Sequence, residues 1–471
     1  MSNPYEPPAT KEPLFRRRWV PDLLASRWGR MIAFFLLYVT EGIPLGFTAT
    51  AVATQMRRQG IGPAAIGVFV GTLYLPWAWK WVVAPVVDIA ASRRFGRRRV
   101  WIVAMQTLMI IALAMSMGVD FTAQLKLYTA VIFLVNIFGA TQDVAIDALA
   151  CEILEESERG TANGLMFSGA YVGNALGGSG VLFLAGVVGF GNASLLALGA
   201  ILLVLLLVAL PLRERGRLSK SESDAKPADA PQEMLTAIGT RLKTYIIDAI
   251  RAFLGHRGSM LAVVAALLPF GAMSLTLALG TTLAVELGLS DNAIATLALI
   301  CTLTSAGGCV LGGYLSDVLG RRKMLAIYII VMSIPPLIMA WYMQREGYIM
   351  PVDPTLENRP AVPAVLVQVF WIVSITYSFF QGLMYGTRTA MFMDVCSKAV
   401  AATQFTAYMS LLNLTIWYSA TWQGWYIESR GYPRTLLLDV ALGVVCLAVL
   451  PWVSPRREPA DATERQGASR R

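Results

Sequence analysis

Long apolar stretches separated by short cationic loops recur along the whole chain. A helix needs about 20 mainly apolar residues to cross a bilayer, and no stretch alternates polar and apolar residues as a barrel strand does. Only 15% of the 471 residues are charged, against roughly 25% in ordinary globular domains. We therefore predict an all-α membrane protein with 12 transmembrane helices. The predicted spans are residues 31–53, 64–90, 99–118, 125–150, 161–187, 191–211, 260–286, 292–317, 323–343, 363–395, 400–423 and 433–452.

The distribution of lysine and arginine predicts which side of the membrane each loop faces. An even number of spans places both termini on one side, and cations concentrate in cytoplasmic segments. Most of the 39 lysines and arginines fall in the tails, the linker and the inner loops if both termini are cytoplasmic. Residues 234–257 have the pattern of an amphipathic helix on the inner leaflet. The predicted organisation is an N-terminal tail (1–30), a six-helix bundle (31–211), a cytoplasmic linker (212–259), a second six-helix bundle (260–454) and a C-terminal tail (455–471).

The amino-acid composition limits which partners, bonds and reactive sites the chain is expected to have. The net charge of +9 follows from cationic loops, so we expect no nucleic-acid partner. The five cysteines form no CxxC pair, and we expect neither disulfides nor a metal site. The single histidine, His256, lies in the linker, so proton chemistry inside the membrane must use carboxylates. No HExxH, GxSxG or His-Asp cluster points to a membrane-embedded enzyme.

The two halves of the sequence repeat one pattern. The second span ends in "APVVDIAASRRFGRRRVW" and the eighth in "GGYLSDVLGRRKML". Each copy gives an aspartate, then a glycine, then a cationic cluster and a new span. Internal repetition of this kind is typical of transporters.

The second copy, "GGYLSDVLGRRK" at 312–323, is similar to the loop signature G-x-x-x-D-x-x-G-R-[RK] of the major facilitator superfamily. The resemblance implies two six-helix bundles and a cytoplasmic latch that breaks as the bundles rock. A static topology anchor is the alternative. We expect Gly313 to let neighbouring helices approach closely. The latch residues implied in the two copies are Asp88, Gly96, Arg97, Arg98, Gly313, Asp317, Gly320, Arg321 and Arg322.

Four further segments carry a closer resemblance. "EGIPLGFTA", "WKWVVAPVVDIAASRRFGRRRVWIVAMQ", "GATQDVAIDALACEILEESERG" and "AATQFTAYMSLLN" look like the AmpG-type muropeptide permeases, and similarly like the acetyl-CoA transporter and siderophore permease branches. The resemblance implies a secondary transporter of the inner membrane. Span five, "GAYVGNALGG", resembles the G-x-x-x-G-P-x-x-G-G of drug antiporters, but Asn174 replaces the proline, which lowers the odds of drug efflux.

Five charged residues fall well inside predicted spans and away from their ends, where each costs about 2.5–3.5 kcal/mol and therefore indicates function. They are Glu41, Lys80, Asp143, Asp147 and Arg388. At about 1.5 Å per residue, most of them lie within one layer of the membrane. Asp439 is expected near the interface, at the outer end of the last span.

These residues suggest a division of roles. Glu41 or Asp143 would exchange the coupling proton, with Asp147 one turn from Asp143 on the same helical face. Lys80 or Arg388 would bind an anionic group of the substrate. Structural ion pairs, Glu41 with Lys80 and Asp143 with Arg388, are the alternative.

Aromatic and amide side chains complete the expected substrate site. Tyr385 is one helical turn from Arg388, and sugars and flat rings stack on such faces, although packing or interfacial roles are the common alternative. Gln142 and Asn413 are expected to bind substrate by hydrogen bonds.

The favoured interpretation is a monomeric, multi-pass inner-membrane transporter for a small molecule, driven by the proton gradient and without a cofactor. A muropeptide-like sugar-peptide is the first cargo, and a siderophore, an acyl-CoA or nucleotide-type compound, or an exported drug or metabolite is an alternative. A membrane-embedded enzyme and a non-transporting sensor are the other classes.

Overall fold

The computed structural model is a bundle of helices. It describes residues 22–453, except 90–97, 121–122, 155–158, 215–238, 241–242, 245, 248–249, 252–256, 276–277, 360 and 397–400. The predicted tails and most of the predicted linker, including much of 234–257, therefore lie outside the described residues. We refer below to residues 22–214 as the first half and to residues 257–453 as the second half.

The helices of the first half follow the order of the predicted spans. Pro76 precedes a break at Trp79, so the predicted span 64–90 is two helices, as expected where proline removes a hydrogen-bond donor. The segments between α1 and α2 and between α7 and α8 are π-helical. The elements are η1 (Leu23–Ala25), α1 (Arg27–Gly46), η2 (Phe47–Val52), α2 (Ala53–Arg58), α3 (Pro63–Ala78), α4 (Lys80–Ile89), α5 (Arg99–Met117), α6 (Leu125–Ile153), α7 (Arg159–Ala175), η3 (Leu176–Gly180), α8 (Val181–Val188), α9 (Phe190–Ala193), α10 (Leu195–Val204) and η4 (Leu205–Ala209).

The helices of the second half are longer. The predicted span 260–286 is interrupted between Ala266 and Ala278, so it too is two helices. The elements are α13 (Arg257–Ala266), α14 (Ala278–Glu286), α15 (Asp291–Leu319), α16 (Arg321–Arg345), α17 (Ala364–Val395), α18 (Ala401–Arg430), α19 (Tyr432–Val445), η6 (Cys446–Ala448) and η7 (Leu450–Trp452).

Nine helical segments in the described part of the chain are long and apolar enough to cross a membrane. The other three predicted spans coincide with α3 and α4, with α13 and α14, and with α18, which are shorter or more polar. Twelve crossings and cytoplasmic termini therefore stay predictions.

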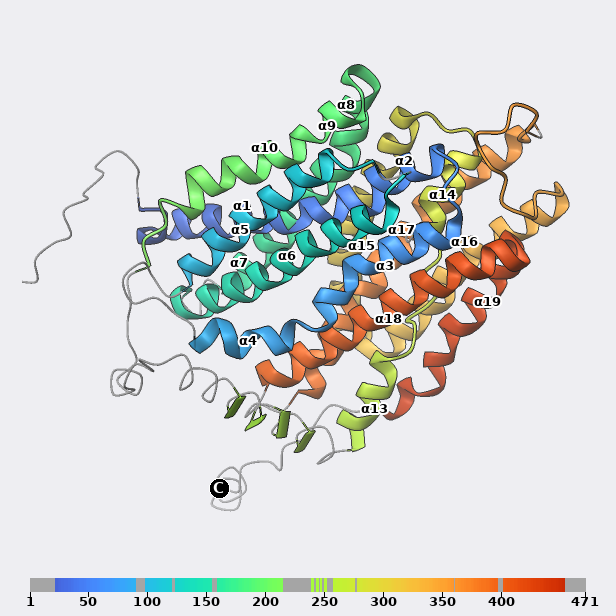
Figure 1. Cartoon of the computed structure of the whole chain (residues 1–471). Helices are drawn as coiled ribbons and strands as arrows, with labels where there is room; N and C mark the ends of the chain where they lie inside the picture. Colours follow the sequence, from blue (N-terminus) through green and yellow to red (C-terminus); the bar gives the residue numbers. More distant parts are fainter. Residues whose placement is uncertain are drawn as a thin grey trace, which may run out of the picture.

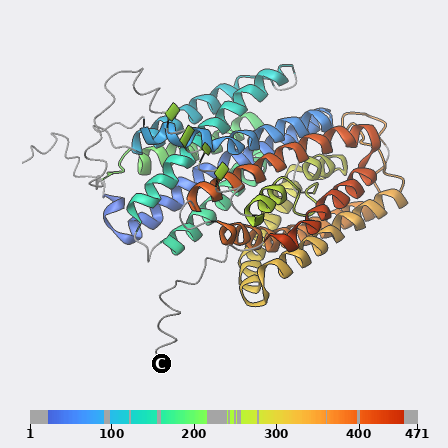
Figure 2. The same cartoon turned by 90° about the horizontal axis from the view of Figure 1, so that it is seen from below.

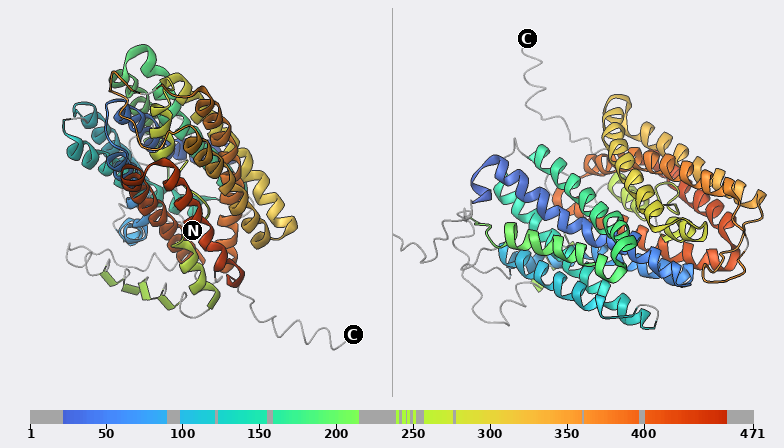
Figure 3. Two further views of the ribbon diagram at one scale, coloured as in Figure 1. Left: turned by 90° about the vertical axis from the view of Figure 1, so that its right-hand side faces the viewer. Right: turned by 90° about the horizontal axis from the view of Figure 1, so that it is seen from above.

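The two halves lie side by side. Figure 1 shows the helices running along a common axis, and α3 of the first half packs along α18 of the second. Figure 2 and the right panel of Figure 3 show the blue-to-green helices on one side and the yellow-to-red helices on the other. We call the end of the bundle that carries residues 346–362 the distal end. The opposite end, where the described chain ends at Val453, is the proximal end.

Glycine allows the closest helix contact within the first half. A Cβ on Gly173 of α7 would lie 2.1 Å from the carbonyl oxygen of Val39 in α1, and one on Gly177 would lie 2.2 Å from that of Ile43. Backbones that touch in this way need glycine at the crossing. The glycines of the fifth span therefore fix α1, which carries Tyr38 and Glu41, against its neighbour.

The break in the seventh predicted span is held by a buried carboxylate. Asp439, which we expect near the outer end of the last span, is 1% exposed and therefore buried in protein. Its Oδ2 accepts the backbone N–H groups of Met273 and Ser274 at 2.8 and 2.9 Å, and its Oδ1 accepts from Gln423 at 2.7 Å. The freed backbone donors of the broken helix are thus satisfied by protein, as membrane burial requires.

Candidate functional site

Five polar residues of the first half converge inside the bundle, and we call them the acidic cluster: Tyr38 and Glu41 on α1, Lys80 on α4, and Asp143 and Asp147 on α6. The Nζ of Lys80 lies 3.0 Å from Oδ2 of Asp143. The hydroxyl of Tyr38 donates to Oδ1 of Asp147 at 2.5 Å. Glu41 interacts electrostatically with both aspartates and with the lysine. Three carboxylates therefore share one ammonium group, that of Lys80, whose side chain is 17% exposed.

A threonine beside the cluster organises two amides. The Nε2 atoms of Gln106 and Gln142 donate to the hydroxyl oxygen of Thr40 at 3.1 and 2.8 Å, and that hydroxyl donates to the carbonyl of Leu37 at 2.6 Å. The Oε1 atoms of both glutamines and Oε2 of Glu41 are buried without a partner among the described residues. These atoms are free to accept hydrogen bonds.

Arg388 lies apart from this cluster, on α17 of the second half. Its guanidinium stacks on the ring of Tyr385 at 4.2 Å and faces that of Phe270 at 5.8 Å. The alternative pairing of Asp143 with Arg388 is not formed, and Lys80 pairs with Asp143 rather than Glu41. Asn413 is half-buried on α18. The structure thus joins the predicted proton groups and Lys80, and places Arg388 with Tyr385.

At the proximal end, each half carries a matching ion pair. Arg98 contacts Glu152 at 3.0 Å and donates to the carbonyl of Val87, and Arg321 contacts Asp394 at 2.5 Å and donates to that of Ala390. Each pair joins the segment after the signature loop to the inner end of α6 or α17 in the same half. In the described part, these arginines tie each half to itself.

Some of the other predicted latch residues are described by the structure, and the rest are not. Arg322 donates to the carbonyl of Pro451 at 3.2 Å, and Gly320 turns the chain between α15 and α16 with φ of +96°. Gly313 corrects our expectation, because a Cβ there would meet nothing within 4 Å, whereas one on Gly312 would lie 2.4 Å from the carbonyl of Leu383. Gly96 and Arg97 and the side chains of Asp88 and Asp317 lie outside the described residues.

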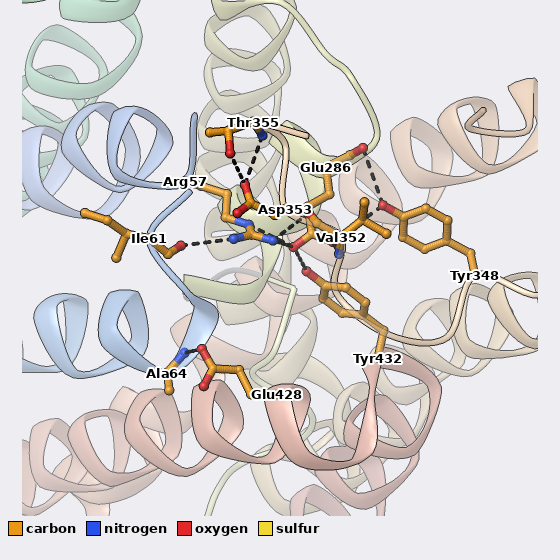
Figure 4. Close-up of polar contacts among 10 residues, drawn as sticks. All are labelled: Arg57, Ile61, Ala64, Glu286, Tyr348, Val352, Asp353, Thr355, Glu428 and Tyr432. Carbon is orange, nitrogen blue, oxygen red and sulfur yellow. Dashed lines mark hydrogen bonds and ion pairs between the residues drawn. The ribbon is translucent and has the colours of Figure 1, made fainter. Parts of the chain in front are cut away.

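The distal end carries a polar cluster that the sequence did not reveal (Figure 4). Arg57 of the first half is 3% exposed, and its nitrogens donate to Oε1 of Glu286 at 2.9 Å, the carbonyl of Ile61 at 3.1 Å and that of Val352 at 2.7 Å. Glu286 also accepts from the hydroxyl of Tyr432 at 2.5 Å and the backbone N–H of Val352 at 2.9 Å. A buried ion pair therefore joins the two halves.

Further contacts extend this junction, which we call the distal seal. Arg58 of the first half lies 2.5 Å from Oδ1 of Asp291, and Glu428 accepts the backbone N–H of Ala64 at 2.9 Å. In the loop that supplies Val352, hydrogen bonds from the backbone N–H and hydroxyl of Thr355 lower the pKa of Asp353 below its ordinary value. The halves are thus closed against each other at the distal end.

The comparisons with known proteins agree with this architecture. The sequence model of the Major Facilitator Superfamily matches residues 30–420 and, in a second match, 261–470. The anhydromuropeptide permease of Escherichia coli (strain K12) is 25% identical over 444 residues, which cover 89% of this chain and 79% of the permease.

Solved structures share the fold. The xylose transporter XylE from E. coli, in an inward open conformation, gives a TM-score of 0.63 at 12% identity and covers 94% of this chain and 100% of its own. A D-xylose-proton symporter gives 0.61 at 14% identity, with coverages of 91% and 97%. These similarities are those of transporters and permeases, and not of enzymes.

Proposed function

Because this chain belongs to the Major Facilitator Superfamily, we propose that it is a proton-coupled secondary transporter that moves a bulky polar metabolite by alternating access. The first cargo is a sugar-peptide related to that of the anhydromuropeptide permease it resembles. We place it in the inner membrane as a monomer, with the proton gradient as its energy source and no cofactor.

The acidic cluster is the observation that carries proton coupling. Three carboxylates, those of Glu41, Asp143 and Asp147, surround one ammonium group within predicted spans. Ionising all three in a low-dielectric interior leaves uncompensated charge, and a bound proton removes part of it. Lys80 holds Asp143 and Tyr38 holds Asp147, while Oε2 of Glu41 has no partner among the described residues. We therefore assign the coupling proton to Glu41.

Alternating access is supported by a difference in the contacts between the two halves at the distal and proximal ends. The distal seal joins the two halves through charged side chains, whereas the described ion pairs at the proximal end stay within one half. With both termini in the cytoplasm, the distal end faces outward. In this orientation the structure corresponds to a transporter that is closed to the outside, and breaking the distal seal opens the other pathway.

The choice of cargo follows from the permease relative and from the side chains available. A sugar-peptide offers hydroxyl and amide donors, carboxylates and flat sugar faces. The free acceptors near Thr40 suit the donors, and Arg388 on Tyr385 suits a carboxylate next to a flat surface. The hydroxyl, amide and carboxylate groups of this cargo thus have suitable binding residues in both halves.

Purified protein in liposomes tests the proposal. We expect wild-type protein to accumulate radiolabelled anhydromuropeptide when a proton gradient is imposed, and to exchange it in counterflow without one. Glu41→Gln should abolish gradient-driven accumulation while keeping counterflow. Glu346→Gln, a matched change at the distal end of α16, should behave as wild type.

Two results would contradict the proposal. Accumulation by Glu41→Gln that still follows the proton gradient removes Glu41 from coupling. A wild-type protein that binds the muropeptide but moves none, in either assay, supports the sensor class instead.

A further inference from the structure

Arg388 differs from the other buried arginines in the described part of the chain. Three arginines there are buried: Arg57, Arg98 and Arg388. Glu286 neutralises the first and Glu152 the second. No described carboxylate lies within 4 Å of Arg388, and its Nε has no hydrogen-bond partner among the described residues. A buried guanidinium without an anion is strongly unfavourable in a low-dielectric interior, so Arg388 is suited to an anion that arrives from outside the chain.

The surroundings of Arg388 hold its guanidinium in place by ring contacts and by a hydrogen bond with Tyr385, and they leave Nε without a partner among the described residues. The group stacks on Tyr385 at 4.2 Å, with Phe270 at 5.8 Å. Phe270 is itself packed edge-on against Phe392 at 5.8 Å, and it belongs to the broken segment that Asp439 stabilises. The edge of the planar guanidinium that carries Nε is suited to meet a carboxylate with two parallel bonds.

The site also faces the boundary between the halves. A Cβ on Gly386, which lies between Tyr385 and Arg388 in α17, would lie 2.5 Å from the carbonyl oxygen of Cys309 in α15. The hydroxyl of Tyr171 lies 3.5 Å from Sγ of Cys309 in α15 of the second half. Arg388 and Tyr385 therefore lie where a molecule held between the halves would touch them.

We propose that Arg388 binds one carboxylate of the cargo, and that the hydroxyl- or amine-bearing part of the same molecule faces Glu41 and Gln142 in the first half. This inference rests on the proposed function, and it fixes the direction in which the cargo lies across the two halves. A chain of phosphates requires several cations. Lys80, the other cation away from the ends of the predicted spans, is already paired with Asp143, so the geometry points to a carboxylate and not to a polyphosphate.

The decisive experiment compares two forms of one probe. Calorimetry on the purified full-length protein measures the dissociation constants of two compounds. One is anhydromuropeptide, and the other is the same molecule with its carboxyl groups converted to primary amides. We expect amidation to weaken binding to wild-type protein at least tenfold. Arg388→Gln should bind both forms equally and weakly, and Arg388→Lys, which keeps the charge but not the planar fork, should recover part of the preference.

Arg345→Gln is the matched control, because Arg345 is exposed and pairs only loosely, at 3.7 Å, with its neighbour Glu346. It should discriminate the two probes as wild type does. Equal binding of acid and amide by wild-type protein overturns the inference, and so does a preference for the acid that survives in Arg388→Gln.

A second arm separates this inference from the choice of cargo. Benzoate and its neutral analogue benzamide are added at equal ionic strength, and the apparent melting temperature is recorded. Benzoate should stabilise wild-type and Arg345→Gln more than benzamide does, and the difference should vanish in Arg388→Gln. If this holds while the muropeptide does not bind, the proposed cargo is wrong and the carboxylate site stands. If the difference is absent, or pyrophosphate stabilises more than benzoate, the carboxylate site is wrong.

Discussion

Replacing Glu286 by glutamine should shift the protein toward a state that is open at the distal end. The carboxylate of Glu286 is 2% exposed and receives hydrogen bonds from Arg57, Tyr432 and the backbone of Val352. The substitution keeps the shape of the side chain and removes its charge. Arg57 is then a buried cation with only carbonyl partners, but only while the halves are closed.

The structure sets the size of the effect. Removing one partner of a buried ion pair costs about 3–5 kcal/mol. We take the lower limit of about 3 kcal/mol because glutamine still accepts from Tyr432 and the carbonyls of Ile61 and Val352 still bind Arg57. Arg57 regains water when the halves separate, so nearly all of this cost falls on the closed state. Since about 1.4 kcal/mol is a factor of ten, the ratio of closed to open protein should fall about 100-fold.

Spin labels on the two sides of the seal measure this ratio. Gln59 of the first half and Glu357 of the second are both exposed and are labelled after replacement by cysteine, on a background without the native cysteines. In Glu286→Gln, pulsed dipolar spectroscopy should show a longer distance as the major population. Glu346→Gln, in a pair within one half whose partner Arg345 is exposed, is the control. Unchanged distances in Glu286→Gln would refute the view that this ion pair holds the halves together.

Three further predictions concern the interior. Gly173→Ala should lower stability by about 1–3 kcal/mol through overpacking against α1, read as a loss of melting temperature, whereas Gly199→Ala, where a Cβ meets nothing within 4 Å, should not; equal melting would contradict the close crossing. Asp439→Asn should destabilise the protein by about 1–3 kcal/mol because a buried acceptor of three hydrogen bonds is altered, and an unchanged melting temperature would count against that role. Lys80→Gln should reduce muropeptide transport at least tenfold because it leaves Asp143 unpaired, while Lys126→Gln at an exposed helix start should not; full activity of Lys80→Gln would remove the pair from function.

Long-range periodicity predicted much of the helical content. The apolar stretches at 99–118, 125–150 and 363–395 correspond closely to α5, α6 and α17, because a membrane helix must be long and apolar. The interruptions at Trp79 and between Ala266 and Ala278 were not predicted. Apolar composition continues through both breaks, and the partners that satisfy the second break, Asp439 and Gln423, are far away in the sequence.

For the polar residues, too, the sequence indicated which residues matter but not which partners they contact. The cost of a charge in the membrane singled out Glu41, Lys80 and Asp143, and the structure gathers them. Their pairing could not be read from the sequence, because depth along a helix does not say which face meets which neighbour. Tyr38 lies three residues before Glu41, so helical spacing could have identified it, whereas Thr40 and Gln106 resemble ordinary core residues. Arg57 and Glu286 looked like residues at the ends of spans.

The charged contacts of the distal seal fit a transporter whose halves rock against each other. Within the first half, α1 and α7 touch through glycines whose backbones are in direct contact, and a gap of about 0.5–1 Å already forfeits a quarter to a half of the attraction across such a contact. Between the halves, glycine also meets backbone where α3 crosses α18, since a Cβ on Gly67 would lie 2.6 Å from the carbonyl oxygen of Ala420, and the distal seal adds charges to this contact. A buried ion pair adds little net stability, because desolvation offsets most of the attraction, yet it is highly sensitive to geometry. Water that enters as the halves part solvates Arg57 and Glu286 and recovers much of what the seal loses. Glycine packing therefore holds α1 against α7, while the charged seal itself can part at the distal end at a small net cost.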